Sequence, residues 1–515
     1  MADILNPATG ERVAEQQQHQ REHALRAAEQ ARRVQPSWTL RPVRDRARMI
    51  RTVGHWVVEH ADELSRIISS CTGKPLVDAL STEVLPAAIM SDYYARIAPR
   101  TLRPERLRRA SVLFANKRST LHRQPFGVVG IISPWNYPLG IPLHEVISGL
   151  LAGNAILLKV ATQVQPVGDV IGRMFEESGL PEGLLHVLHL PGRESGDALL
   201  EAGVGKLFFT GSTEVGRELA RKAGERLVPV SLELGGNDPM IVLEDAPIER
   251  AAACAVWAGL SNAGQSCGAV ERIYVHDAVW DRFIAALRPA VEQMIPNDRD
   301  AYATNLGVLT TADQLDVVKA QLSHALDGRG HVLASTTGGG SGLFHPAVVV
   351  EVTRDDAMLV QEETFGPLLA VRRVASVEEA LERANGSRYG LSASVWTRRG
   401  RLAREIASRL EAGAVTINDH LMSHGMPETP WGGVKESGIG RSHSRLGLEE
   451  MTQPKVVVEE RFPWIRKNMW WHPYSREVYE AVVGGLHARY GTGAGRRVRG
   501  LLRAVRLFVR RARGK

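Results

Sequence analysis

Two patterns of hydrophobic and polar positions divide the chain. Residues 20–70 alternate charged and apolar faces and are rich in helix formers, which predicts helices there. From Gly127 onward, short apolar runs are followed by glycine or proline turns and then by helical stretches. Such runs are typical of parallel strands that helices cover on both faces. We therefore expect an α/β protein with at least two sheets, its strands near residues 128–132, 155–158, 206–209, 240–243, 272–275 and 414–417.

Length and composition point to a multidomain globular protein. With 515 residues, two or three domains are expected, and 44% hydrophobic and 23% charged residues are ordinary values. The first residues lack the basic region and apolar core of a signal peptide, and no apolar stretch is long enough to span a membrane. We expect a cytoplasmic protein.

The three cysteines predict a reducing compartment rather than a disulfide framework, because their number is small and odd. Cys254 lies in an apolar helical run and is interpreted as a small core residue. Cys71 directly precedes Thr72-Gly73-Lys74-Pro75, which is typical of a helix that ends at a glycine cap. Cys267 stands in a different context.

Asn262-Ala263-Gly264-Gln265-Ser266-Cys267 places a thiol among small residues, where a substrate can approach a nucleophile closely. Taken by itself, the segment favours a buried structural thiol over a nucleophile. In Ser231-Leu232-Glu233-Leu234-Gly235-Gly236, a carboxylate lies between leucines, so that desolvation would raise its pKa toward that of a general base. The alternative for Glu233 is a solvated carboxylate at the end of a strand or helix.

Two further motifs follow predicted strands. In Ser133-Pro134-Trp135-Asn136-Tyr137-Pro138, two prolines stiffen a loop whose Asn136 amide could donate to a developing oxyanion, or could simply belong to a turn. Phe209-Thr210-Gly211-Ser212 leads from a strand into a helix, whose first N–H groups would favour a pyrophosphate. Its spacing is not GxGxxG, so a plain turn remains the alternative.

Taken together and in this order, these motifs resemble the NAD(P)-dependent aldehyde dehydrogenase superfamily. The similarity runs from about Asn6 to about Val458, and includes Glu362-Glu363-Thr364-Phe365-Gly366-Pro367 and a glycine-rich segment at residues 430–441. The resemblance implies that Cys267 attacks the aldehyde and passes through a thioester, that Asn136 binds the oxyanion, and that Glu233 activates the hydrolytic water. It implies a homo-oligomer and a small aldehyde substrate, and assigns the cofactor, NAD or NADP, to Pro134, Trp135, Lys159, Gly211, Ser212, Gly216, Glu363 and Phe365.

One position departs from many NAD-preferring members, which carry an acidic residue three positions after the lysine matching Lys159. Here that position is Thr162. A carboxylate would repel a 2′-phosphate and a threonine does not, so NADP is compatible with this site and the preference stays open. Glu233 favours an acid-forming reaction over a CoA-dependent or reductive enzyme of the same fold. A catalytically inactive membrane-associated scaffold is the alternative from another class.

The implied architecture has a Rossmann-like cofactor domain, an α/β catalytic domain and a small β extension for oligomerisation. The expected boundaries are residues 1–232 for the cofactor domain (with 97–123 in the extension), 233–430 for the catalytic domain, 431–460 for a return segment with an oligomerisation strand, and 461–515 for a tail. Neither His186 with His189 nor His420 with His424 has the acidic or cysteine partners of a metal site, so these residues are interpreted as ordinary loop or surface histidines and no metal is expected.

The basic charge of the chain is confined to the tail. Residues 481–515 hold ten Lys and Arg and no acidic residue, whereas the first 480 residues hold 54 basic and 57 acidic residues.

A glycine-rich hinge at 491–495 precedes apolar residues at helical spacing with arginines between them, and aromatic residues lie upstream. Residues 496–515 therefore predict a basic amphipathic helix that binds an anionic membrane surface, peripherally on its inner face, and favour a lipophilic aldehyde. Packing on the enzyme or a partner subunit is the second possibility, and nucleic-acid binding is disfavoured by the apolar stripe. The stripe comprises Val498, Leu501, Leu502, Val505, Phe508, Val509 and Ala512, and the upstream aromatic residues are Phe462, Trp464, Trp470, Trp471 and Tyr474.

Overall fold

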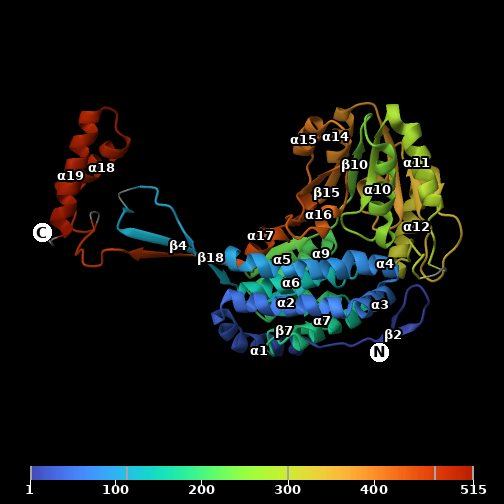
Figure 1. Ribbon diagram of the computed structural model, residues 1–515, viewed down its shortest axis with the longest axis horizontal. Helices are drawn as coiled ribbons and strands as arrows, with labels where there is room; N and C mark the ends of the chain where they lie inside the picture. Colours follow the sequence, from blue (N-terminus) through green and yellow to red (C-terminus); the bar gives the residue numbers. More distant parts are fainter. Residues whose placement is uncertain (1–2, 112–113, 298–300, 469–470, 513–515) are drawn as a thin grey trace. The chain divides into compact units, whose positions relative to one another are not determined.

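A computed structural model describes residues 3–111, 114–297, 301–468 and 471–512. The chain forms two compact units. The first contains Met1–Leu102 and Gln124–Gln453, and the second contains Arg103–Arg123 and Pro454–Lys515. The first unit holds two α/β lobes, and the ribbon in Figure 1 follows the chain from one lobe into the other and back.

The amino-terminal segment is helical, as its pattern predicts. The helices are α1 (Arg21–Leu40), α2 (Val43–Glu59), α3 (Ala61–Thr72), α4 (Leu76–Ala79) and α5 (Leu85–Thr101). Helix α3 ends at Gly73, whose φ of 74° is the left-handed conformation expected of a helix cap. A Cβ at Gly73 would lie 2.2 Å from the Val308 side chain, so the cap also permits a close approach.

The first lobe is built on a six-stranded sheet in the order β17-β9-β8-β5-β6-β7, parallel except for β17. Helices follow its strands, so that chain segments cross over between parallel neighbours. The strands are β5 (Val128–Ile132), β6 (Ala155–Lys159), β7 (Leu185–Leu188), β8 (Lys206–Thr210), β9 (Val230–Glu233) and β17 (Gly438–Ile439), and the helices are α6 (Gly140–Ala152), α7 (Gln165–Glu177), α8 (Gly192–Glu201) and α9 (Thr213–Glu225).

The second lobe is built on a seven-stranded sheet in the order β12-β13-β14-β11-β10-β15-β16, in which only β12 is antiparallel. Met240 and Val242 of β10 belong to one hydrophobic cluster and Ile241 belongs to another, which shows that the strand is buried on both faces. The strands are β10 (Asp238–Val242), β11 (Val270–His276), β12 (His331–Ser335), β13 (Val348–Glu351), β14 (Leu368–Val374), β15 (Ser392–Trp396) and β16 (Ala414–Ile417). The helices are α10 (Ile248–Leu260), α11 (Trp280–Glu292), α12 (Ala312–Asp327), α13 (Met358–Gln361), α14 (Val377–Asn385), α15 (Gly400–Arg409) and α16 (Met422–Gly425). Helix α17 (Ser444–Glu450) packs on α5 and α6 of the first lobe.

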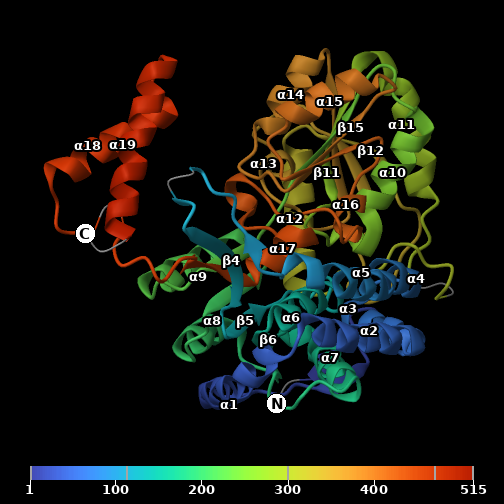
Figure 2. The same cartoon turned by 60° about the vertical axis from the view of Figure 1, so that its left-hand side comes forward.

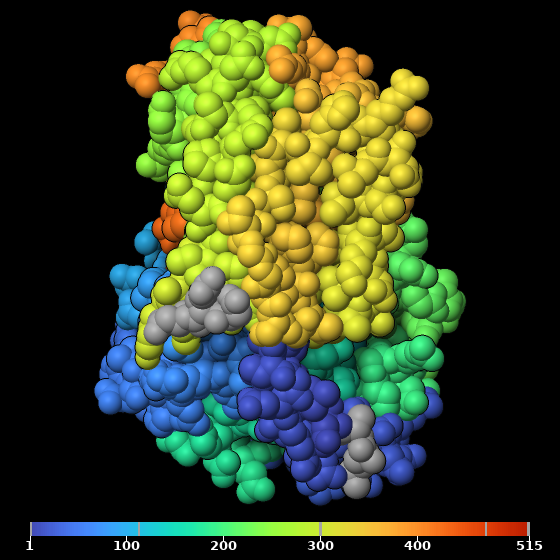
Figure 3. All heavy atoms as spheres, turned by 90° about the vertical axis from the view of Figure 1, so that its right-hand side faces the viewer, coloured from blue at the N-terminus to red at the C-terminus, as the bar shows by residue number. Residues whose placement is uncertain are grey.

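Strands β1 (Asp3–Leu5) and β2 (Arg12–Glu15) pair antiparallel and form an amino-terminal hairpin. Its turn contacts the second lobe, because the Leu343 N–H donates to the Pro7 carbonyl at 2.9 Å and the Ser341 hydroxyl donates to the Ala8 carbonyl at 3.0 Å. Figure 3 shows this dark blue segment against the yellow surface of the second lobe.

The second unit contains a three-stranded sheet and two helices. The sheet has the order β18-β4-β3, formed by β3 (Glu105–Arg106), β4 (Lys117–Pro125) and β18 (Thr452–Glu460). Helices α18 (Arg476–Tyr490) and α19 (Ala494–Ala512) lie side by side, as Figure 2 shows. Residues 97–101 complete α5 in the first unit, so the strands of the extension begin only at Glu105.

The tail contains the expected amphipathic helix and one helix that the pattern did not indicate. Helix α19 packs on α18 through Ala504 and Leu507. The exposed residues of the predicted apolar stripe are Val498, Leu501, Leu502, Val505, Phe508 and Val509. Trp470 and residues 513–515 lie outside the described residues. No helix among the described residues is long and apolar enough to cross a membrane.

Candidate active site

The carboxyl ends of β5, β8 and β9 face loops of the second lobe, where open α/β sheets place their ligands. Between them lies a cavity of about 250 Å³. It brings together most of the residues that the motifs singled out: Asn136, Glu233 and Cys267, with Pro134, Trp135, Gly211, Ser212, Glu363 and Phe365. Lys159 and Gly216 are not among its lining residues.

Cys267 follows a turn that forces the backbone into an unusual path. Asn262, Ala263 and Gly264 have φ angles of 52°, 53° and 75°. A Cβ at Gly264 would lie 2.1 Å from the Gly366 carbonyl oxygen, so a side chain at this position would collide with the backbone. A Cβ at Gly236 would likewise lie 2.2 Å from the carbonyl oxygen of Cys267. The glycines of two motifs therefore allow the Cys267 loop to pack against its neighbours.

The Cys267 thiol is partly exposed and carries no fixed cation beside it. Burial raises its pKa, and the negative charges of Glu363, Asp238 and Glu233 raise it further. Burial also raises the pKa of the structural thiol Cys71, to about 12, although a hydrogen bond with Ser70 lowers it. The sulfur of Cys267 is therefore protonated at neutral pH, and forming the thiolate requires a base or a positive charge in the cavity.

Glu233 is the last residue of β9 and pairs with Gly438 of β17. Burial raises its pKa well above the ordinary range, with repulsion from Glu145 next, while a hydrogen bond from Ser442 and the charge of Arg441 lower it. Its Oε2 atom is buried without a hydrogen-bond partner. A desolvated carboxylate with a free oxygen in the cavity can accept a proton, as the sequence predicted for this residue.

The loop that carries Asn136 is fixed by a buried ion pair. The Lys74 ammonium lies 2.6 Å from a Glu83 oxygen, both side chains are fully buried, and the ammonium also donates to the Asn136 carbonyl at 2.8 Å. The other Glu83 oxygen accepts the Leu139 N–H at 2.8 Å. Asn262, from the Cys267 turn, donates to the same Asn136 carbonyl at 3.0 Å. These bonds tie the asparagine loop to the cysteine turn.

The Asn136 amide itself is held for donation. Its Nδ2 donates one hydrogen to the Gln265 carbonyl at 3.1 Å, which leaves the second hydrogen of the same amide for another acceptor. Because both the amide and Cys267 line the cavity, a carbonyl attacked by the sulfur would lie near this donor.

Glu363 and Phe365 lie on a loop that a second carboxylate holds in place. Both Glu271 carboxylate oxygens accept the Thr364 N–H, at 3.0 and 2.9 Å, and one accepts the Phe365 N–H at 2.8 Å. Glu363 in turn accepts the Gly236 N–H at 2.9 Å, and burial raises its pKa to about 7. The Phe365 ring meets the Trp135 ring edge-on at 5.5 Å and closes one side of the cavity.

The opposite side of the cavity fits a dinucleotide. Helix α9 begins at Thr213, directly after Gly211 and Ser212, and the Ser212 side chain does not cap it, so its first N–H groups are available to an anion. Lys159 ends β6, where burial lowers its pKa to about 8. Gly216 does not line the cavity, but a Cβ there would lie 2.4 Å from the side chain of Leu234, which does, so the absence of a side chain lets α9 pack closely against the cavity wall.

Several residues near Cys267 were not singled out from the sequence. His144 and Glu145 of α6, His443 before α17 and Ser442 line a smaller cavity together with Glu233 and Cys267. Their spacing along the chain gave no pattern, because α6 and the segment after β17 meet only in the folded protein. Glu145 is a buried carboxylate on a helix whose other described buried residues include many aliphatic side chains, and that mismatch was the one available signal.

His189 and His420 lie in loops, as one part of the interpretation expected, but both are buried rather than at the surface. His189 and His420 are 3% and 0% exposed. His189 has an acidic partner, since its Nε2 lies 2.8 Å from Asp169, and His420 bonds to the Ser394 hydroxyl at 2.8 Å. Among the residues that the structure describes, no group of three or more His, Cys, Asp or Glu side chains is arranged to hold a metal.

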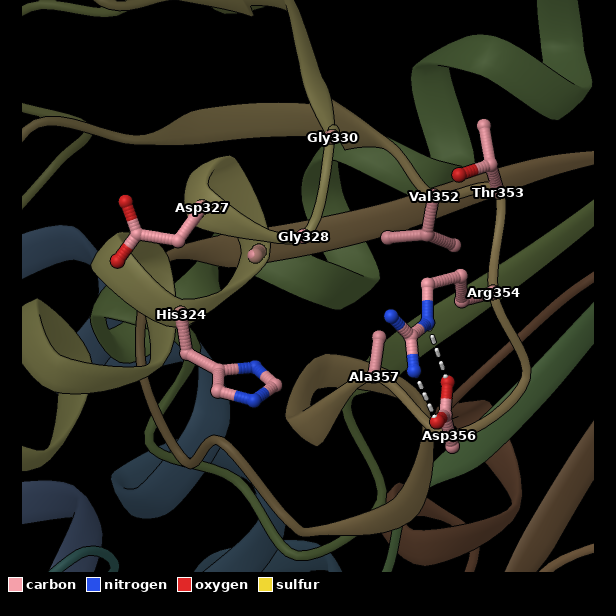
Figure 4. Close-up of a pocket in the computed structure, with 10 residues that line it drawn as sticks. His324, Asp327, Gly328, Gly330, Val352, Thr353, Arg354, Asp356 and Ala357 are labelled. Atoms are coloured by element: carbon pink, nitrogen blue, oxygen red, sulfur yellow. Dashed lines mark hydrogen bonds and ion pairs between the residues drawn. The ribbon is translucent and has the colours of Figure 1, made fainter.

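A separate cavity of about 280 Å³ lies beside the end of α12 and the segment after β13. Figure 4 shows that its Arg354 guanidinium is occupied by Asp356 in a two-point ion pair, one bond of which is 2.8 Å long. Figure 4 also labels the His324 imidazole and the Asp327 carboxylate there. With its arginine neutralised and no cysteine among its lining residues, this cavity shows none of the chemistry of the site around Cys267.

Comparison with known proteins agrees with this geometry. The model of the aldehyde dehydrogenase family matches residues 1–457. The 4,4′-diapolycopene aldehyde oxidase of Methylomonas sp is 35% identical over 483 residues, 93% of this chain and 90% of that protein. The succinate-semialdehyde dehydrogenase structure from Burkholderia pseudomallei superposes with a TM-score of 0.84 at 31% identity, covering 89% and 94% of the two chains. An E. coli NADP dependent enzyme does so with a TM-score of 0.83 at 30% identity, with the same coverage.

These matches span both lobes of the first unit and exceed what fold similarity alone would give. The α/β fold, with its Rossmann-like sheet, is that of the solved relatives, and NAD or NADP is the cofactor. The chain belongs to the aldehyde dehydrogenase family and is an NAD(P)-dependent oxidoreductase that oxidises aldehydes.

Proposed function

We propose that this enzyme converts an apolar aldehyde to its carboxylic acid through a thioester on Cys267. One observation carries the proposal: a single cavity presents a partly exposed thiol, a desolvated carboxylate at Glu233 and an amide donor at Asn136. Those are the three groups that acyl transfer to water requires, namely a nucleophile, a base and an oxyanion donor.

In the first half-reaction, the Cys267 thiol gives its proton to water as its sulfur attacks the aldehyde carbonyl, and the product is the anion of a thiohemiacetal. The Asn136 amide donates to the oxyanion while its loop is held by Lys74 and Glu83. When bound, the oxidised nicotinamide supplies a positive charge and accepts a hydride. Glu363, Phe365, Lys159 and the start of α9 would hold it, and the carbon left on the sulfur is then at the oxidation level of a thioester.

In the second half-reaction, water replaces the sulfur. Glu233 accepts a proton from the water as its oxygen bonds to the thioester carbonyl, and the carbon–sulfur bond breaks with its electron pair returning to Cys267. A raised pKa suits this step, because Glu233 binds the proton firmly. An enzyme that transfers the acyl group to CoA would not need this base.

Support for an apolar substrate comes from the side chains around the cysteine. Tyr137, His424 and Trp431 form a group of rings, with centroids of Tyr137 and His424 6.0 Å apart and those of His424 and Trp431 4.9 Å apart. Burial lowers the pKa of His424 to about 4, so this ring is uncharged at neutral pH. One relative is named a 4,4′-diapolycopene aldehyde oxidase, and the aldehyde in that name supports the proposed substrate class.

The test is oxidation of straight-chain aldehydes of increasing length with NAD or NADP, with and without CoA. We expect kcat/KM to rise with chain length and the free acid to be the product in every case. A preference for short, charged aldehydes would contradict the substrate class. An acyl-CoA product would contradict the hydrolytic step.

We also propose that the α18–α19 hairpin binds an anionic membrane surface. Helix α19 carries seven arginines and no acidic residue, and Leu502 is 64% and Phe508 40% exposed. An apolar stripe flanked by cations matches anionic headgroups over an acyl layer. Co-sedimentation with phosphatidylcholine vesicles, with and without phosphatidylglycerol, tests it. Binding to the anionic vesicles that is lost on deleting residues 491–515 is expected, and no binding to either vesicle would contradict it.

A further inference from the structure

A second, smaller cavity lies directly behind the reacting groups. Its volume of about 20 Å³ is enough for one water molecule. It shares Cys267, Glu233, Leu234 and Thr210 with the larger cavity, so it adjoins the reaction site. Its remaining wall comes from α6, α16 and the segments around Trp431 and Ser442.

Unpaired polar atoms converge on this small cavity. Four of its lining side chains have a buried atom without a hydrogen-bond partner: Glu145 Oε2, Glu233 Oε2, Thr210 Oγ1 and His443 Nδ1. A buried polar atom that lacks a partner costs about 1–3 kcal/mol. One water in this space has the polar neighbours that such a site requires.

Glu145 is the least expected of these residues. It lies on α6 at 3% exposure, one helix turn beyond the asparagine loop. Burial raises its pKa to about 8, and the second cause of the raised pKa of Glu233 is the Glu145 charge, so the two carboxylates are close enough to repel. Each negative charge raises the pKa of the other carboxyl group, so the two groups ionise in succession and the second ionises only at higher pH.

The groups around the pair do not neutralise it. The three histidines that line the cavity are His144, His424 and His443, and burial lowers the pKa of His144 to about 3, that of His424 to about 4 and that of His443 well below its usual value. All three are uncharged at neutral pH. The Cys267 thiol is protonated, and Arg441 is the cation that acts on Glu233.

We propose that Glu145 is a positioning residue that receives, through a water in the small cavity, the proton that Glu233 takes during thioester hydrolysis. This inference rests on the proposed function. Protonated Glu233 donates its proton to the cavity water, and that water donates one of its own to the Glu145 carboxylate. Glu233 becomes a carboxylate again, the water is unchanged, and one O–H bond forms for each that breaks.

The relay requires ionised Glu145. A group of pKa about 8 is mostly protonated at pH 7 and mostly ionised at pH 9, so thioester hydrolysis should accelerate across that interval. Glu145→Gln keeps the shape and cannot accept the proton. Ser148→Ala is the matched control, because Ser148 is a buried residue of the same helix that does not line the cavity.

The experiment measures the first turnover and the steady state separately, with decanal and NADP, from pH 6 to pH 10. In Glu145→Gln we expect the burst of NADPH to persist, the steady-state rate at pH 8 to fall at least tenfold, and the rise between pH 7 and pH 9 to vanish. Glu145→Asp should restore part of the rise, and Ser148→Ala should match the wild type. A Glu145→Gln steady state with the wild-type rate and pH profile would overturn the relay.

A measurement on the unaltered enzyme covers the case in which Glu145→Gln does not fold. Steady-state rates in mixtures of H₂O and D₂O should bow downward with deuterium content, because at least two protons move in the relay. A straight line would count against it. Failure of the proposed function looks different: the wild type would show neither a burst nor an acyl group on Cys267.

Discussion

The active site around Cys267, which we call the catalytic junction, and the α18–α19 hairpin of the tail place their charged residues in opposite environments. At the junction, Lys74 and Glu83 pair with both side chains fully buried, and three carboxylates crowd the Cys267 thiol. In the hairpin, the arginines of α19 other than Arg511 are exposed beside exposed apolar side chains, and the buried contact is small, formed by Val478, Ala481 and Leu507.

This contrast shows where each region's function resides. Burial at the junction perturbs protonation, so the chemistry depends on groups that solvent cannot screen. Among its described residues, the hairpin has no cluster of groups with shifted pKa values. Its capacity to bind a partner comes from the side chains that it leaves exposed. Substitutions should therefore change rate and pH dependence at the junction, and binding in the hairpin.

The largest effect is expected from Cys267→Ala, which removes the nucleophile. Oxidation of decanal should fall by on the order of a thousandfold or more, measured as NADPH formation. Cys254→Ala, in helix α10, is the control and should retain activity. Substantial turnover by Cys267→Ala would contradict a thioester intermediate on Cys267.

The second effect concerns stability. Lys74→Met leaves Glu83 charged and buried without its partner, which should cost about 3–5 kcal/mol in the free energy of unfolding, measured with denaturant. Lys222→Met breaks a surface pair with Asp197 and should cost less than about 1 kcal/mol. An equal loss in the free energy of unfolding for the two variants would contradict the claim that burial makes the Lys74–Glu83 pair more important for stability than a surface pair.

A third prediction tests the hairpin. The double variant Leu502→Asp, Phe508→Asp places two carboxylates in the apolar stripe, and should weaken binding to anionic vesicles by on the order of tenfold or more without changing the rate on a water-soluble aldehyde. Leu40→Asp, an exposed leucine of α1, is the control. Unchanged vesicle binding by the double variant would show that the stripe has another partner.

The smallest effect is a shift in thiol reactivity. Because the pKa of Cys267 is raised, its alkylation by iodoacetamide should be slow at pH 7 and still increase above pH 10. Glu363→Gln removes the largest of the neighbouring negative charges, lowers that pKa and should speed alkylation several-fold at pH 8. The rate is followed by peptide mass spectrometry. A plateau near pH 8 in the wild type would contradict the electrostatic account.

The sequence predicted much of the junction, since its contributions come from local motifs. A strand followed by a glycine turn places Gly211 and Ser212 at a helix start, and the glycines beside Cys267 and Glu233 indicate close backbone approaches. The role of Glu145 could not be predicted, because its proximity to Glu233 depends on how α6 packs. A single carboxylate in an apolar helix does not indicate which group it will lie near.

The tail was predicted in part, for the opposite reason. The regular spacing of apolar residues indicated α19, and its arginines showed which face stays polar. Helix α18 was missed because two glycines, Gly484 and Gly485, interrupt its pattern. In the folded hairpin they allow close packing: a Cβ at Gly484 would lie 2.8 Å from the Gly500 carbonyl oxygen.

The central claim is that Glu233 hydrolyses a thioester formed on Cys267. The most direct measurement mixes Glu233→Gln with decanal and NADP, quenches the reaction in acid and determines the intact mass of the protein. The account predicts one equivalent of NADPH and a stable decanoyl group on Cys267, which the wild type loses within the same time. If Glu233→Gln turns over like the wild type and carries no acyl group, the account is contradicted.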